Sequence, residues 1–182
     1  MRHLTTAEIA RCALLTALIA VGAFITIPLG PVPFTLQTFA VLLAGMVLGP
    51  RLGALSVVAY LALGLVAPVY AGGASGVGAL LGPTGGYLLA FIPAVIVTGV
   101  IASGDAAPTG RLILAGLLGL LPIYAIGATW LAFQLDLGAA AAVSAGVLPF
   151  VVMDAVKALL AAGVARALVS SPLGLPAAQR DR

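Results

Sequence analysis

The sequence predicts an all-α integral membrane protein with six transmembrane helices and both termini on the cytoplasmic side. The first observation is composition, since 63% of the residues are hydrophobic and 7% are charged, whereas soluble domains carry about 25% charged residues. The second is a mean hydropathy of +1.26. The third is that the few charges are separated by long uncharged runs. The 182 residues fit one membrane domain, 1–182.

The first two helices are predicted at 8–27 and 34–48. No charged residue lies between Arg11 and Arg51, and this run is too long for one membrane-spanning helix of about 20 residues. The prolines and glycine between residues 27 and 33 cannot continue a helix. We therefore expect a proline-rich connection between the two helices.

The third and fourth helices are predicted at 52–66 and 86–101, on either side of a glycine-rich segment, 67–85. This segment carries no charged residue, whereas a linker exposed to water would be more polar. Long connections without obvious secondary structure are usually lids or binding loops. A flexible connector is the alternative interpretation.

The last two helices are predicted at 112–134 and 149–169. A polar turn at 103–111 precedes the fifth helix, and Pro149 suits the first turn of the sixth. The small apolar residues 139–148 form either a short helix or part of a loop. The polar tail from Ser170 is expected to fray.

The arginines predict the orientation of the chain. With six helices both termini lie on one side, and every arginine falls on that side, while Lys157 lies within the last helix. Because basic residues accumulate in cytoplasmic loops, we expect a multi-pass protein of the cell membrane, with Asp105 in the cytoplasm and Gly76 outside. The arginines are Arg2, Arg11, Arg51, Arg111, Arg166, Arg180 and Arg182.

Two charged residues, Asp154 and Lys157, fall inside the last predicted helix. Three positions apart, they share one helix face. A charge at the bilayer centre costs about 2.5–3.5 kcal/mol on insertion scales, so such residues usually face a partner or a cavity. The pair forms either the floor of a ligand site below the 28–33 and 67–85 loops, or a self-neutralising pair that only stabilises helix packing.

Several classes of function are disfavoured. The charges form no basic stripe, so we expect no nucleic-acid binding. The only lysine follows a valine, so no G-x-x-x-x-G-K-[ST] phosphate loop exists and ATP binding by that mechanism is excluded. The single histidine, His3, and the single cysteine, Cys12, argue against a metal site or a Ser–His pair. We expect no enzyme, no metal and no bound cofactor.

Helix 8–27 carries two small residues four positions apart, Ala13 and Ala17. Small residues at this spacing let helix backbones approach closely. This face therefore either packs within the bundle or binds a partner subunit.

Four ordered motifs resemble the BioY family, the substrate-binding S components of energy-coupling factor (ECF) biotin transporters. The resemblance covers about residues 8–168. The motifs are PLGPVPFTLQT at 28–38, LGPRLG at 48–53, LGPTGGY at 81–87 and LPFVVMDAVK at 148–157.

The resemblance implies a six-helix protein that captures biotin from outside the cell. It also implies a partner module of one transmembrane T subunit and two cytoplasmic ATPases, which use the ATP that this chain does not bind. Ala13 and Ala17 match the small-residue face by which such S components contact the T subunit. Membrane lipid is the remaining expected partner.

The family's aspartate and lysine on the last helix match Asp154 and Lys157. Biotin has a carboxylate tail, a ureido ring with two N–H donors, and an apolar thioether ring. Lys157 would neutralise the carboxylate, Asp154 would accept ureido N–H bonds, and Gln37 would supply an amide. Further contacts are expected from Gly73 and Gly85, by close backbone approach, and from the rings of Tyr87 and Trp130.

Two alternatives stay open. One is an S component for a different vitamin, and the other is a structural membrane protein in which Asp154 and Lys157 serve packing alone. Trp130 is likewise open to a second interpretation, as an aromatic anchor at the membrane interface.

Overall fold

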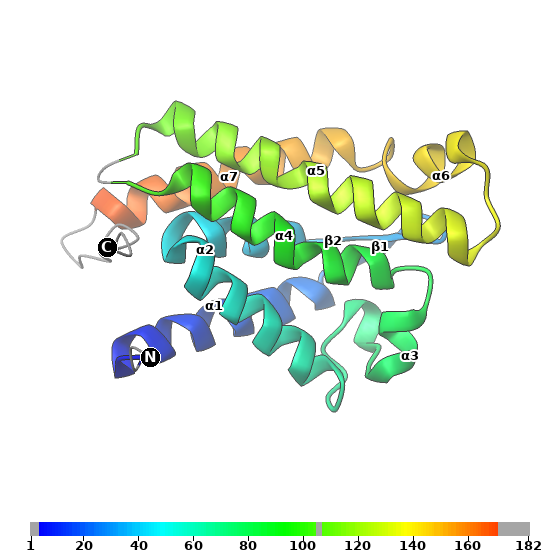
Figure 1. Cartoon of the computed structure of the whole chain (residues 1–182), viewed down its shortest axis with the longest axis horizontal. Coiled ribbons are helices and arrows are strands. Elements are labelled where there is room, and N and C mark those ends of the chain that lie inside the picture. Colours follow the sequence, from blue (N-terminus) through cyan, green and yellow to red (C-terminus); the bar gives the residue numbers. More distant parts are fainter. Residues whose placement is uncertain (1–3, 105–106, 171–182) are drawn as a thin grey trace.

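The computed structural model describes residues 4–104 and 107–170, which form a mostly helical bundle (Figure 1). Asp105 and the arginines at positions 2, 180 and 182 lie outside the described residues. The elements in chain order are α1 (Thr6–Phe24), β1 (Thr26–Pro28), β2 (Pro33–Thr35), α2 (Gln37–Gly64), the 3-10 helix η1 (Ala71–Gly73), α3 (Gly76–Leu81), α4 (Gly85–Ala102), α5 (Thr109–Gln134), α6 (Ala139–Gly146) and α7 (Val151–Ser170).

Four helices in the described part of the chain are long and apolar enough to cross a membrane: α1, α2, α4 and α5. The pair α6 and α7, bent by 49°, passes the same test as one unit and raises the number to five. The predicted number is six, and the difference lies in α2, which the sequence divides into two helices.

The helix α2 reverses its direction at Gly49. This glycine has φ 76° and ψ −179°, outside the helical region, and Pro50 follows it. The carbonyl oxygen of Ala44 lies 3.3 Å from where a Cβ on Gly53 would stand, although a straight helix would separate these residues by roughly 13 Å. The halves before and after the break run in opposite directions (Figure 1).

The connection between α1 and α2 is a β-hairpin, and here the predicted helix boundaries are wrong. The helices predicted at 8–27 and 34–48 extend into Thr26–Pro28 and Pro33–Thr35, which pair as β1 and β2. Both strands contain proline, which cannot donate to a helix ladder, and β-branched residues, which favour strands. The other end of α1 begins with a capping box between Thr5 and Glu8.

The remaining boundaries move by a few residues. The helices predicted at 86–101, 112–134 and 149–169 are α4, α5 and α7, with the bounds given above. The segment 67–85, expected as a loop, contains η1 and α3. Residues 139–148 contain α6, so the short-helix alternative is confirmed, and its run of alanines is the best helix-forming composition.

Small residues set the distances between the helices. The helix α7 packs against α2 and α5, and α4 packs against the same two. A Cβ on Gly99 would stand 2.4 Å from the backbone nitrogen of Pro50, and one on Gly116 would stand 3.0 Å from the Cβ of Ala158. Such close approach substitutes for hydrophobic driving force between membrane helices. The contact at Gly116 brings α5 close to α7, which carries the charged pair.

The bundle has two unlike ends. The loop end, on the right in Figure 1, comprises the β1–β2 hairpin, residues 65–84 and residues 135–150. The arginine end, on the left, comprises the start of α1, the break in α2, residues 103–104 and 107–108, and the last turns of α7. The described arginines lie in the parts of α1, α2, α5 and α7 nearest that end.

Candidate functional site

The centre of the candidate site is the charged pair in the first two turns of α7. The Nζ atom of Lys157 lies 2.6 Å from Oδ1 of Asp154, to which it donates a hydrogen bond. Each residue is only 4% exposed. Isolated charges are very costly to bury, so the two ions must satisfy each other and their neighbours. The helix spacing of three that the sequence shows therefore produces a direct contact.

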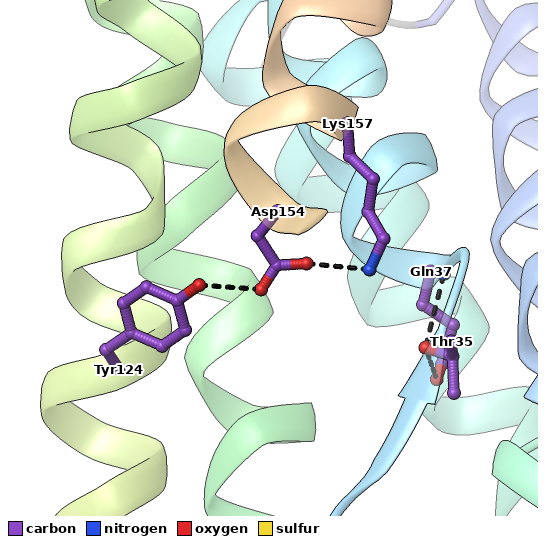
Figure 2. A network of polar contacts seen from close by, with 5 residues as sticks. All are labelled: Thr35, Gln37, Tyr124, Asp154 and Lys157. Carbon is purple, nitrogen blue, oxygen red and sulfur yellow. Dashed lines mark hydrogen bonds and ion pairs between the residues drawn. The ribbon is translucent and has the colours of Figure 1, made fainter. Parts of the chain in front are cut away.

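Tyr124 of α5 provides the second partner of the carboxylate. Its hydroxyl donates to Oδ2 of Asp154 at 2.8 Å, from the side opposite Lys157 (Figure 2). Each carboxylate oxygen thus receives one hydrogen bond, which fixes the plane of the carboxylate. A carboxylate offers about four acceptor positions, so Asp154 keeps acceptor capacity for a further donor.

Lys157 points from α7 toward the junction of β2 and α2, where Thr35 and Gln37 lie (Figure 2). Its Nζ atom stands 3.7 Å from the centre of the Phe34 ring, an arrangement in which the ring face stabilises the cation. Among the described residues it donates one hydrogen bond, to Asp154. An ammonium has three N–H donors, so Lys157 keeps donors for a ligand.

Gln37 is 2% exposed, and its side-chain amide is held at both ends. The hydroxyl of Thr35 donates to its Oε1 at 3.1 Å, and its Nε2 donates to the Tyr60 hydroxyl at 2.5 Å. Thr35, Gln37, Tyr124, Asp154 and Lys157, the residues drawn in Figure 2, are called the polar site below. They bring the adjoining elements β2 and α2 together with α5 and α7, which come much later in the sequence.

A cavity of about 60 Å³ lies at the loop end, beneath η1 and α3. It is mostly apolar and receives residues from β2, from the 65–84 segment and from the start of α4. Its lining consists of Val32, Pro33, Tyr70, Ala71, Ala74, Ala79, Thr84, Tyr87 and Leu88. Pro33 is the neighbour of Phe34, over which Lys157 lies, so the cavity and the polar site share the hairpin as a wall.

The segment over this cavity is fastened at both of its ends. At the first end the Tyr70 hydroxyl donates to the Leu61 carbonyl at 2.6 Å, and burial raises the pKa of Tyr70, which keeps that donor protonated. At the other end, the Trp130 indole N–H donates to the Gly82 carbonyl at 2.9 Å, and the Gln134 amide donates to the Leu81 carbonyl. The middle of the segment is fastened by none of these bonds.

The family model described as "BioY family" matches residues 1–172. The chain belongs to the BioY family. A "Probable biotin transporter BioY" of Pyrococcus horikoshii is 47% identical over 88% of this chain and 95% of that protein. A "Biotin transporter BioY" of Thermotoga maritima is 43% identical over 87% of this chain and 93% of that protein.

A solved structure agrees with the family assignment. It is a crystal structure of "the S-component for biotin from an ECF-type ABC transporter", with a TM-score of 0.82 and 33% identity. The similarity covers 93% of this chain and 96% of that one. The fold described above is therefore the S-component fold, and the expected family is confirmed.

The other residues predicted for binding in this BioY chain have varied positions. Tyr87 lines the cavity, and its hydroxyl donates to the Gly146 carbonyl at 2.9 Å. Gly73 is exposed with φ +78°, and Gly85 approaches the chain's own backbone, since a Cβ there would stand 1.7 Å from the Leu80 oxygen. Half-buried Trp130 covers Gly86 in addition to its bond with Gly82.

Ala13 and Ala17, predicted as a partner-binding face of this BioY chain, are exposed on α1, whereas Ala20 is buried. The exposed alanines are thus available to another helix. The groups that sequence reasoning missed are Tyr124, Thr35, Phe34 and Tyr60. Thr35 and Phe34 stand in the same motif as Gln37, so motif position is a signal for them. Tyr60 and Tyr124 lie in other helices, and only the packing reveals them.

Within residues 4–104 and 107–170, no group of three or more His, Cys, Asp or Glu side chains is arranged to hold a metal ion. Cys12 is buried, and its thiol lies 3.5 Å from the Leu52 carbonyl oxygen, where it packs between α1 and the second half of α2. This thiol therefore contributes to helix packing.

Proposed function

We propose that this chain is the substrate-capture subunit of an ECF biotin transporter and binds biotin at the loop end. The observation that carries the proposal is the buried Asp154–Lys157 pair, which keeps both acceptor and donor capacity beside Gln37. The family, the two biotin transporters named above and the biotin S-component structure support it.

The charge of the polar site indicates which end of biotin it accepts, and it favours the ureido ring over the carboxylate, which the resemblance had assigned to Lys157. Asp154 and Lys157 neutralise each other, so a buried biotin carboxylate would leave a net negative charge in a dry interior, which is costly. The ureido ring is neutral, with a carbonyl oxygen flanked by two N–H donors. Lys157 donates to that oxygen, Asp154 accepts from an N–H, and Gln37 offers its remaining donor or acceptor. The carboxylate then extends toward the aqueous side of the loop end.

The cavity and its cover supply the rest of the site. Pockets for small ligands have about 300–1,000 Å³, so the cavity of about 60 Å³ must widen to hold biotin. Biotin enters when the middle of the 65–84 segment moves outward, and its apolar ring packs against Tyr87 and the hairpin. Gly73 gives this segment the backbone freedom that the motion needs.

The topology of the proposal has six membrane-crossing segments, with the two halves of α2 counted separately. Each half, at roughly 20 Å, is shorter than a hydrocarbon core of about 30 Å, which leaves space for the hairpin and the 65–84 segment above them. The arginine end lies in the cytoplasm by the positive-inside rule, both termini included. The loop end faces outward across the cell membrane.

The partners follow from the role as an S component. Ala13 and Ala17 form the contact with one transmembrane T subunit, and two ATPases bound to that subunit use ATP. This chain itself catalyses no reaction and holds no cofactor. The exposed apolar side chains around the bundle face lipid.

Equilibrium binding of radiolabelled biotin to the purified chain in lipid nanodiscs tests the function. We expect saturable binding that an excess of biotin amide also displaces, because the amide keeps the ureido ring. Thiamine and riboflavin should not compete. Displacement by another vitamin but not by biotin would assign the chain to a different substrate, and no saturable binding would favour the structural role.

A further inference from the structure

The amide of Gln37 belongs to a hydrogen-bond chain that leaves the polar site. Thr35 donates to Gln37, Gln37 donates to the Tyr60 hydroxyl, and Tyr60 donates to the Val69 carbonyl at 3.2 Å. Because the last acceptor is a backbone carbonyl, which cannot donate, the Tyr60 proton points toward Val69. The amide nitrogen of Gln37 must then face Tyr60, and its oxygen must face Thr35. One orientation of the amide is therefore selected.

The same tyrosine stands at the base of the segment that covers the cavity. Tyr60 and Tyr70 pack edge to face, with ring centres 5.6 Å apart. The Tyr70 ring fits over Gly64, where a Cβ would stand 2.0 Å from its Cε1. Tyr70 and Ala71 line the cavity, and positive-φ glycines at 72, 73 and 76 follow directly. Tyr60 thus contacts both the polar site and the fixed start of the cover.

We infer that Tyr60 is a positioning residue for biotin capture, acting through Gln37 and not by touching the ligand. Its hydroxyl holds the Gln37 amide in the orientation that faces the ligand. The same hydroxyl bonds to Val69, next to Tyr70, so the amide orientation depends on where the start of the cover lies. The inference rests on the proposed function. Tyr60 lies in α2 outside the four sequence motifs, and the inference explains why a phenol is buried there.

The alternative role for Tyr60 is structural, since its ring is fully buried and its packing alone contributes to the fold. The two roles separate on removal of the hydroxyl. Tyr60→Phe keeps the ring and its contact with Tyr70 but removes the acceptor for Gln37 and the donor for Val69. Losing one net hydrogen bond corresponds to an affinity loss of about threefold to tenfold.

A double-mutant cycle on biotin dissociation constants tests the inference in nanodiscs. The cycle combines Tyr60→Phe with Gln37→Ala. If Tyr60 acts through Gln37, its substitution weakens binding in the wild type and has no effect in the Gln37→Ala background. Thr35→Val, which frees the other end of the amide, should behave in the same way. Ser56→Ala is the matched control, since this fully buried hydroxyl of the same half of α2 donates only to its own helix at Leu52.

The outcomes are distinct. Coupled losses, with unchanged binding in Ser56→Ala, support the positioning role. Equal losses from Tyr60→Phe with and without Gln37, or a Tyr60→Phe chain that does not fold, assign the hydroxyl to stability and overturn the inference while wild-type biotin binding stands. Absence of biotin binding by the wild type overturns the proposed function, and this inference with it.

Discussion

The loop end and the arginine end of the bundle use their polar groups in opposite ways. At the arginine end, Arg111 donates from Nε to the Ile101 carbonyl at 2.6 Å and from a terminal nitrogen to the Ser103 carbonyl, which closes the end of α4. At the loop end, polar side chains bond across β2, α2, α5 and α7 and leave capacity unused. At the arginine end these bonds satisfy nearby backbone carbonyls, whereas at the loop end they join side chains of different elements into the polar site.

The cations at the two ends differ in their exposure to solvent. Arg51, Arg111 and Arg166 are exposed, and in the proposed topology they orient the chain in the membrane. Lys157 is buried against Asp154 and Phe34, where its desolvation is expensive. A buried charge that only held helices together would be replaced by apolar packing at little loss. This difference supports the proposal that Lys157 is kept at this position for ligand binding.

Removal of the buried cation has the largest expected effect. Lys157→Ala should weaken biotin binding by about 2–5 kcal/mol, the range for truncating one partner of a buried charged hydrogen bond. Arg166→Ala, on the same helix at the arginine end, is the matched control and should leave the dissociation constant unchanged. Titration with radiolabelled biotin measures both, and equal losses in the two variants would contradict the division of roles between the ends.

A second change separates ligand binding from packing. In Lys157→Ala, Asp154 stays buried with Tyr124 as its remaining partner. Adding Asp154→Asn removes the stray charge, so the double variant should unfold at a higher temperature than the single one while biotin binding stays lost. A double variant that recovers biotin binding would remove both residues from the site.

Loosening the cover at the loop end has an intermediate expected effect. Trp130→Phe and Gln134→Ala each remove one side-chain donor to the end of α3. Freed at that end, the segment should open more often and release biotin about threefold to tenfold faster, the equivalent of one net hydrogen bond. Stopped-flow chase of bound biotin measures the rate. An unchanged rate in both variants would show that the end of α3 does not control release, and slower release would show that these bonds do not retain biotin.

Most helices could be predicted because the membrane imposes length and composition on them. Runs without charge, bounded by arginine and by Gly-Pro pairs such as Gly49-Pro50, locate the segments. The predictions fail where apolar chain is not helical, as at Thr26–Pro28. Hydropathy does not distinguish an apolar strand from the end of an apolar helix, and only pairing with Pro33–Thr35 decides the matter.

The charged centre of the site could also be predicted, because Asp154 and Lys157 form a local helix pair. The rest of the site is assembled by tertiary packing. Tyr124 reaches Asp154 because Gly116 brings α5 close to α7, and Tyr60 reaches Gln37 because α2 reverses at Gly49. Neither contact has a signature in sequence spacing. Gly85 stays a predicted ligand contact, and in this structure its lack of a side chain makes room for the Leu80 carbonyl.

The exposed alanines on the side of the bundle should have little effect on either end. Ala13→Leu with Ala17→Leu adds bulk at two positions of α1 that are exposed in the described part of the chain. Biotin affinity should change by less than about twofold, whereas biotin uptake and co-purification with a T subunit should fall, because bulky side chains prevent close helix approach. Loss of biotin binding in this variant would place the two alanines in internal packing.

The smallest effect on affinity is expected from two single cysteines that test the ends themselves. In a Cys12→Ala background, Val77→Cys lies on exposed α3 at the loop end. Gly110→Cys lies in the first turn of α5 at the arginine end, where an added side chain meets open space. Neither change touches the polar site, so biotin affinity should stay at its wild-type value.

With a membrane-impermeant maleimide, intact cells should label position 77 alone, and permeabilised cells should label both. Labelling of both positions in intact cells would place the two ends on one side of the membrane, which an odd number of crossings between residues 77 and 110 forbids.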